Sequence, residues 1–128
     1  MIFTLGTSQR SLDEFLKILK FYQIKIVVDV RRFPKSKFFW FEKENLKKEL
    51  QKAGIEYYHL ESLGGFRKGG YENYMKTEDF KKGIQKVLEL SKKGNLVLIC
   101  KEKFPWRCHR RFIKNYLKKM GVEVLDII

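Results

Sequence analysis

The segment ICKEKFPWRCHRRF, residues 99–112, gathers side chains that can carry out chemistry. It holds both cysteines of the chain, Cys100 and Cys108, together with the carboxylate of Glu102 and the imidazole of His109. A thiolate is a nucleophile, and a carboxylate or an imidazole can transfer protons. The composition of this short segment therefore predicts a reactive or ligand-binding site.

Arginines and aromatic rings in and around this segment favour the binding of phosphate. Arg107, Arg110 and Arg111 surround the predicted start of a helix, where backbone N–H groups and the helix dipole attract anions. Arginine binds phosphate bidentately, and aromatic rings beside cations hold unstacked nucleotides. We therefore predict that a phosphate-bearing ligand, nucleic acid above all, is bound by these residues: Ser8, Arg10, Arg31, Arg32, Lys35, Lys37, Trp40, Trp106, Arg107, His109, Arg110 and Arg111.

The charge of the chain supports an anionic partner. The 128 residues carry a formal net charge of +13, and the excess of bases is concentrated in two segments. Residues 31–52 hold eight basic and three acidic side chains, and residues 101–119 hold eight basic and one acidic. A one-sided charge of this kind indicates nucleic acid or another anion as partner. The alternative is a lysine-rich surface of the kind found in heat-adapted proteins.

Acid–base chemistry on nucleic acid is a second interpretation of the same residues. Glu102, Asp29 and His59 are candidate catalytic groups, since a carboxylate pair or an acid–imidazole pair can activate water or protonate a leaving base. A glycosylase-like enzyme would stack the extruded base on nearby aromatic rings. The structural alternative is a set of ion pairs, Asp29 with Arg31 or Arg110 and Glu102 with Arg10.

Thiol chemistry is a third interpretation, with Cys100 as the nucleophile. Rhodaneses and cysteine phosphatases place a cysteine after a strand, then a loop, then an arginine near a helix start, and Arg107 follows Cys100 by seven residues. The intervening loop has no glycine, and Pro105 lacks the N–H that a phosphate cradle requires. Cys100 as a small core residue is the structural alternative.

A metal site is the weakest interpretation. Cys100, Cys108, His109 and His59 could supply four ligands, but their spacing lacks the paired pattern of zinc modules. We therefore predict no metal and no cofactor.

Hydrophobic periodicity alternates strands with helices along the chain. Strands are predicted at residues 2–6, 25–31, 55–60, 95–100 and 122–128; helices are predicted from Ser11 and at residues 42–54, 77–92 and 108–120. This order predicts one α/β domain over residues 1–128, in three layers, with a mostly parallel five-stranded sheet and helices on both faces. Ligands of such folds bind at the carboxyl ends of the strands, which is where the candidate residues fall.

Other features bear on location and assembly. Residues 1–9 show no basic segment before an apolar one and no stretch is long enough to span a membrane, so we expect a cytoplasmic protein with free thiols. Four aromatic residues in succession, 38–41, cannot all face inward, and an exposed one would suit a homodimer; we expect a monomer or a homodimer. Glycine pairs at 64–65 and 69–70 bracket a basic loop, either a lid or a flexible turn.

Five successive motifs carry a resemblance to a known family. TLGTSQRSLDEFL, VDVRRFPKSK, YYHLESLGG, YENYMKT and LICKEKFPWRCHR resemble the signatures of the domain of unknown function 488 family, nearly end to end. The resemblance implies a compact α/β domain whose strand-end residues act jointly, and it implies no particular reaction. The first motif of the family is commonly Gly-His-Ser, whereas this chain has Gly6-Thr7-Ser8. Any role of a histidine at this place is therefore absent or filled by another group.

Overall fold

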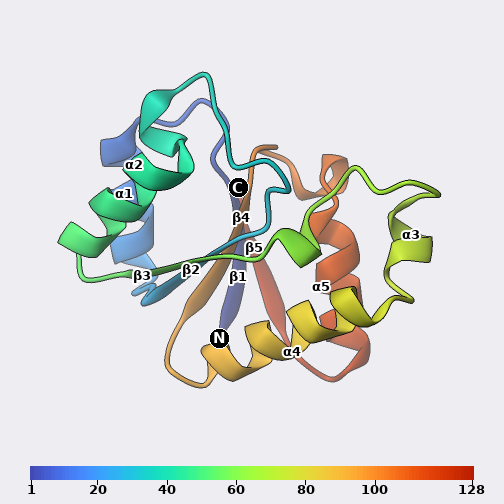
Figure 1. The fold of residues 1–128 in the computed structure, drawn as a ribbon. Coiled ribbons are helices and arrows are strands. Elements are labelled where there is room, and N and C mark those ends of the chain that lie inside the picture. The colour runs from blue at the N-terminus through green and yellow to red at the C-terminus, as the bar shows by residue number, and fades with distance from the viewer.

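A computed structural model describes all residues of the chain, 1–128, and contains one five-stranded sheet (Figure 1). The strands are β1 (Ile2–Gly6), β2 (Ile26–Asp29), β3 (Glu56–His59), β4 (Leu96–Cys100) and β5 (Val124–Ile127). Their order across the sheet is β3-β2-β4-β1-β5, and every neighbouring pair is parallel. The predicted sheet is confirmed.

The helices cover both faces of the sheet, as predicted. They are α1 (Leu12–Phe21), α2 (Lys43–Lys52), α3 (Tyr71–Tyr74), α4 (Glu78–Ser91) and α5 (Arg110–Lys119). Figure 1 shows α1 and α2 on one side of the sheet and α3, α4 and α5 on the other. None of these helices is long and apolar enough to cross a membrane.

Side-chain caps set the starts of two of the helices. The hydroxyl of Ser11 accepts a hydrogen bond from the backbone N–H of Glu14 at 3.1 Å, and that of Thr77 accepts one from Phe80 at 3.3 Å. Each bond satisfies a backbone donor that has no partner within the helix. The capped starts at residues 11 and 77 were both predicted from the sequence.

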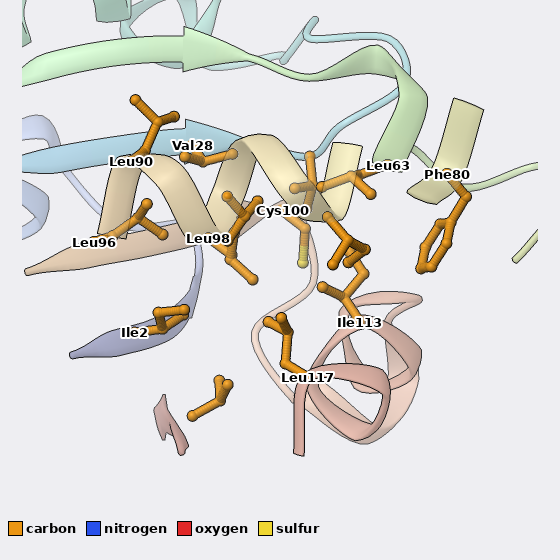
Figure 2. Packing of buried hydrophobic residues seen from close by; sticks show 14 of the residues in the cluster. Ile2, Val28, Leu63, Phe80, Leu90, Leu96, Leu98, Cys100, Ile113 and Leu117 are labelled. Atoms are coloured by element: carbon orange, nitrogen blue, oxygen red, sulfur yellow. The ribbon is translucent and has the colours of Figure 1, made fainter. Parts of the chain in front are cut away.

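Two apolar clusters, one on each face, hold the layers together. The residues of β2 and β4 are all buried, because helices cover both of their faces, and this explains their almost continuous apolar sequence. Leu98 and Cys100 face the cluster under α4 and α5, whereas Val97 and Ile99 face the cluster under α1 and α2. Figure 2 shows Cys100 in the first cluster, near Leu98.

The segment before α5 differs from the prediction. The helix was expected from residue 108, but it begins at Arg110, after a 3-10 turn over Pro105–Arg107 (η3). Cys108 has extended backbone angles, φ −128° and ψ 149°. Cys108 therefore lies just outside the first turn of α5. The short helix α3 was not predicted.

Candidate functional site

A cleft of about 490 Å³ lies at the carboxyl ends of the strands. It is formed by the loop after β2, the loop over residues 64–66 and the segment between β4 and α5, and these residues line it: Arg31, Arg32, Phe33, Lys35, Gly65, Phe66, Cys100, Lys101, Glu102, Arg107, Cys108 and His109. Hollows of similar or larger size lie on the helical surfaces, but no cysteine or histidine lines them. The cleft is therefore the site to which the chemistry of the sequence points.

The lining of the cleft is strongly cationic. Five of its side chains are basic, those of Arg31, Arg32, Lys35, Lys101 and Arg107, and the only acid is Glu102. Low-dielectric walls with charges of one sign focus the field and concentrate ions of the opposite sign. Arg31 and Arg32 form ion pairs with Asp29 and Glu61, and the unpaired Lys35, Lys101 and Arg107 outnumber Glu102, so the lining favours an anion.

Two exposed aromatic rings stand at the same cleft. Phe33 is 63% exposed and Phe66 is 88% exposed. Burying such a ring against a ligand removes a large apolar area from water. Neither residue was among the predicted binding residues, because exposed and core phenylalanines look the same in a sequence.

Close backbone packing places the loop after β3 against the cleft. A Cβ atom on Gly64 would lie 2.5 Å from the Cα of Arg32, and one on Gly65 would lie 3.1 Å from Nδ1 of His109. Arg32 also forms an ion pair with Glu61 at 3.3 Å and donates a hydrogen bond to the carbonyl oxygen of Phe66. This first glycine pair is therefore explained by close packing, and the loop forms one wall of the cleft.

The Gly6-Thr7-Ser8 motif supports the opposite wall. A Cβ atom on Gly6 would lie 1.9 Å from the carbonyl oxygen of Glu102, so only glycine fits there. The backbone N–H groups of Thr7 and Ser8 donate to the carbonyl oxygens of Cys100 and Lys101, at 2.7 and 2.8 Å. Thr7, which stands where the family commonly has histidine, is buried and does not line the cleft.

Asp29 is buried at the end of β2, with both carboxylate oxygens occupied. Oδ1 accepts hydrogen bonds from the backbone N–H and the Nε of Arg31, at 3.1 and 2.8 Å. Oδ2 accepts from Nη2 of Arg31 and from the hydroxyl of Tyr57, both at 2.6 Å. Burial, and then the nearby Asp29 charge, raises the pKa of Tyr57 above its ordinary value. The structure therefore contains the ion pair between Asp29 and Arg31 that the sequence suggested as an alternative to a catalytic role for Asp29.

The other two acid–base candidates are placed differently. His59 contacts the carbonyl oxygen of Arg31 through Nε2 at 2.6 Å and does not line the cleft. Glu102 lines the cleft and is exposed, and it forms no ion pair. Arg10, its suggested partner, pairs with Glu14 at 3.0 Å instead. Of the three candidates, Glu102 alone faces the cleft.

The two thiols and an imidazole meet at one point of the cleft. Cys100 and Cys108 are free and buried, and the thiol of Cys100 donates a hydrogen bond to the carbonyl oxygen of Glu102 at 3.7 Å. The Sγ of Cys108 lies 3.6 Å from Nδ1 of His109, whose Nε2 lies 2.9 Å from the carbonyl oxygen of Val30. A carbonyl accepts only, so Nε2 carries a proton, and Nδ1 is left to exchange one with Cys108.

No group of three or more His, Cys, Asp and Glu side chains is arranged to hold a metal ion.

Several predicted binding residues lie outside the cleft lining. Arg110 is fully buried behind it, and Arg111 donates to the backbone carbonyls of Trp106 and Cys108, at 3.3 and 3.2 Å. The indole N–H of Trp40 donates to the carbonyl oxygen of Arg10 at 3.1 Å. The predicted residues that do not line the cleft are Ser8, Arg10, Lys37, Trp40, Trp106, Arg110 and Arg111.

Comparison with known protein families shows to which family the chain belongs. The family described as Domain of unknown function DUF488 matches residues 11–117. The chain belongs to this family. No curated protein and no solved structure matches the chain.

The DUF488 match covers the whole cleft. All of its lining residues fall between residues 31 and 109, within the matched range. The Gly6-Thr7-Ser8 motif precedes that range, and it supports the cleft from outside the lining. Lys101, which sequence reasoning missed as a binding residue, directly follows the buried strand β4 and could have been found from that position.

Proposed function

We propose that the cleft binds a phosphate-bearing ligand and that single-stranded nucleic acid is the favoured one. The observation that carries this proposal is the lining itself, with five basic side chains, one acid and two exposed phenylalanines in a single cleft. Cations hold the phosphate backbone, and aromatic rings stack on the bases of an unpaired strand. The net charge of +13 would speed the approach of such a polyanion.

The cationic part of the proposal predicts a change in salt dependence. Replacing both Lys101 and Arg107 with alanine is expected to weaken the binding of a thymidine oligonucleotide that is long enough to span the cleft. Each lost phosphate contact lowers the slope of log K against log salt by about 0.7. Fluorescence anisotropy titrations at several salt concentrations measure both quantities.

A matched variant separates the cleft from the overall charge. Lys81→Ala with Lys82→Ala removes the same charge from the exposed surface of α4. This control is expected to keep most of the affinity and the slope. Equal losses in the two double variants would contradict binding in the cleft, and salt-independent binding would contradict phosphate recognition altogether.

The aromatic part predicts a loss of affinity without a loss of stability. Phe66→Ala is expected to weaken oligonucleotide binding about tenfold, because stacking contributes about 1–3 kcal/mol per base. The side chain is 88% exposed, so the melting temperature should stay the same. Phe21→Ala, in a ring that is 79% exposed on α1, is the control and should bind like the wild type. If the Phe66 variant bound the oligonucleotide as tightly as the wild type, base stacking on this ring would be ruled out.

Base-directed hydrolysis is the second candidate, favoured by one observation: Glu102 is an exposed carboxylate in a cationic cleft and has no ion-pair partner. Strands that contain uracil or hypoxanthine, incubated with the protein, treated with alkali and run on a denaturing gel, test it. Intact strands would support binding alone, and cleavage abolished by Glu102→Gln would assign the acid.

A further inference from the structure

Arg110 is a buried cation without a carboxylate partner. Its side chain is fully buried at the start of α5, and none of the ion pairs in the structure includes it. Nη2 donates to the carbonyl oxygen of Lys103 at 2.8 Å, Nη1 donates to the Sγ of Cys100 at 3.2 Å, and Nε has no partner. An isolated buried charge is strongly destabilising, so a negative charge is required near this guanidinium.

The thiol pair is the group placed to carry that charge. Cys100 is 1% exposed and Cys108 is 4% exposed, and each belongs to the same buried cluster. The thiol of Cys100 donates to the carbonyl oxygen of Glu102 at 3.7 Å, and the Sγ of Cys108 lies 3.6 Å from Nδ1 of His109, directly before the first residue of α5. The N-terminus of α5 therefore faces the sulfur, and its dipole stabilises a thiolate there.

These contacts act on the two thiols in opposite directions. Interaction with Cys100, and then with His109, lowers the pKa of Cys108 against the opposing effect of burial. Interaction with Cys108, and then burial, raises the pKa of Cys100. Cys108 is therefore the thiol that ionises first.

We propose that Cys100 and Cys108 form a redox-active dithiol, in which the Cys108 thiolate attacks disulfides that carry anionic groups. The substrate class follows from the cleft, because five basic side chains and two exposed aromatic rings line the approach to Cys108. The chain supplies every group that the reaction needs: a nucleophile, a second thiol in the same buried cluster, and a cation 3.2 Å from that second thiol. The inference uses the same cleft as the proposed function but does not depend on nucleic-acid binding.

The reaction takes place in two exchanges. Cys108 Sγ attacks one sulfur of the substrate disulfide, whose S–S bond breaks, and one thiolate leaves with the bonding electrons. Cys100 then gives its proton to solvent or to the departing thiolate, and Nη1 of Arg110, 3.2 Å away, stabilises the new Cys100 thiolate. Cys100 attacks Cys108 Sγ and expels the second thiolate. The protein dithiol is oxidised to a disulfide while one substrate disulfide is reduced to two thiols.

The environment of Cys108 sets the pH dependence. The titratable or charged groups packed near it are Cys100 of β4, His109 and Arg110 at the start of α5, and Tyr71 of α3. The other charged groups of the cleft are Arg31, Arg32, Lys35, Lys101, Glu102 and Arg107. A lowered pKa keeps Cys108 ionised below the ordinary thiol range. The rate should therefore be nearly flat from about pH 6 to 8, where an ordinary thiol gains about tenfold per unit.

The test uses 5,5′-dithiobis(2-nitrobenzoate), an aromatic disulfide with two carboxylates, and follows release of its coloured thiol. We expect the native protein to react at pH 6 about tenfold faster than the urea-unfolded protein, releasing two equivalents per chain. Cys100→Ser should release one equivalent and retain the mixed disulfide by mass spectrometry. Cys108→Ser should lose the fast reaction. A native rate no higher than the unfolded rate, or a fast reaction in Cys108→Ser, would overturn the proposal, and the first comparison requires no variant to fold.

A cationic disulfide tests the substrate class. Lys101→Ala with Arg107→Ala should slow the reaction of the dianionic disulfide about tenfold and speed that of cystamine, a dication that the native cleft repels. Equal slowing of both would overturn the assignment of an anionic substrate. Oligonucleotide binding is measured on the same wild-type protein. Oligonucleotide binding without the fast disulfide reaction would mean that this inference has failed, and the fast reaction without oligonucleotide binding would mean that the proposed function has failed.

Discussion

Asp29→Ala is expected to lower the free energy of unfolding by about 3–5 kcal/mol, because it leaves the buried guanidinium of Arg31 without its counter-charge. The carboxylate is fully buried and accepts four hydrogen bonds, three from Arg31 and one from the hydroxyl of Tyr57. Without the carboxylate, all of these donors would be buried with no hydrogen-bond acceptor. Urea denaturation followed by circular dichroism measures the change.

Two further variants separate the buried pair from charge in general. Asp13→Ala removes an exposed acid that pairs with Lys17 at 3.0 Å on α1, and it should leave the free energy of unfolding almost unchanged. Adding Arg31→Met to Asp29→Ala should recover part of the loss, since the unpaired buried charge is gone. A loss as small as that of the Asp13 variant would contradict the role of Asp29 as the anchor of Arg31.

Gly6→Ala is expected to lower the free energy of unfolding by at least about 2 kcal/mol and to open the cleft. The new Cβ would lie 1.9 Å from the carbonyl oxygen of Glu102 and 2.8 Å from the Cα of Lys103. Both are backbone atoms, so the end of β1 must move away from the segment after β4, and overpacking of this kind is destabilising. The hydrogen bonds from Thr7 and Ser8 to this segment should weaken in consequence.

Gly54→Ala is the matched control for this effect. Gly54 has a positive φ of 75° with nothing within 4 Å of a new Cβ, so alanine there meets backbone strain alone, worth about 1 kcal/mol. Urea denaturation compares the two variants, and oligonucleotide binding at equal folded fraction reports on the cleft. If Gly6→Ala destabilised no more than Gly54→Ala and bound normally, the close packing of β1 against residues 102–103 would play no part in shaping the cleft.

Arg110 lies beside the thiols and is not part of the cleft lining. Lys35, Lys101 and Arg107 at the opening are exposed, whereas Arg110 lies behind the thiols and forms no ion pair with a carboxylate. Its position at the start of the helix suggested phosphate binding from sequence, because the sequence shows that an arginine follows a turn but not which way it points. In the structure it faces the cluster that contains Cys100.

Local pattern by itself determined the elements and the edge at which the site lies. Alternating strands and helices, capped starts at Ser11 and Thr77, and continuous apolar runs at β2 and β4 depend on neighbours along the chain. These features predicted the parallel sheet and placed the candidate residues at its carboxyl edge.

Only the tertiary structure decided what each side chain at that edge does. Asp29 is an ion-pair anchor because Tyr57 and Arg31 surround it, and both of its oxygens are already used. Cys108 rather than Cys100 is the thiol whose pKa is lowered, by Cys100 first and then by His109, since η3 ends directly before Cys108 and leaves its sulfur next to both. Burial and charge partners arise from segments distant in sequence, and they set pKa and access where spacing along the chain cannot.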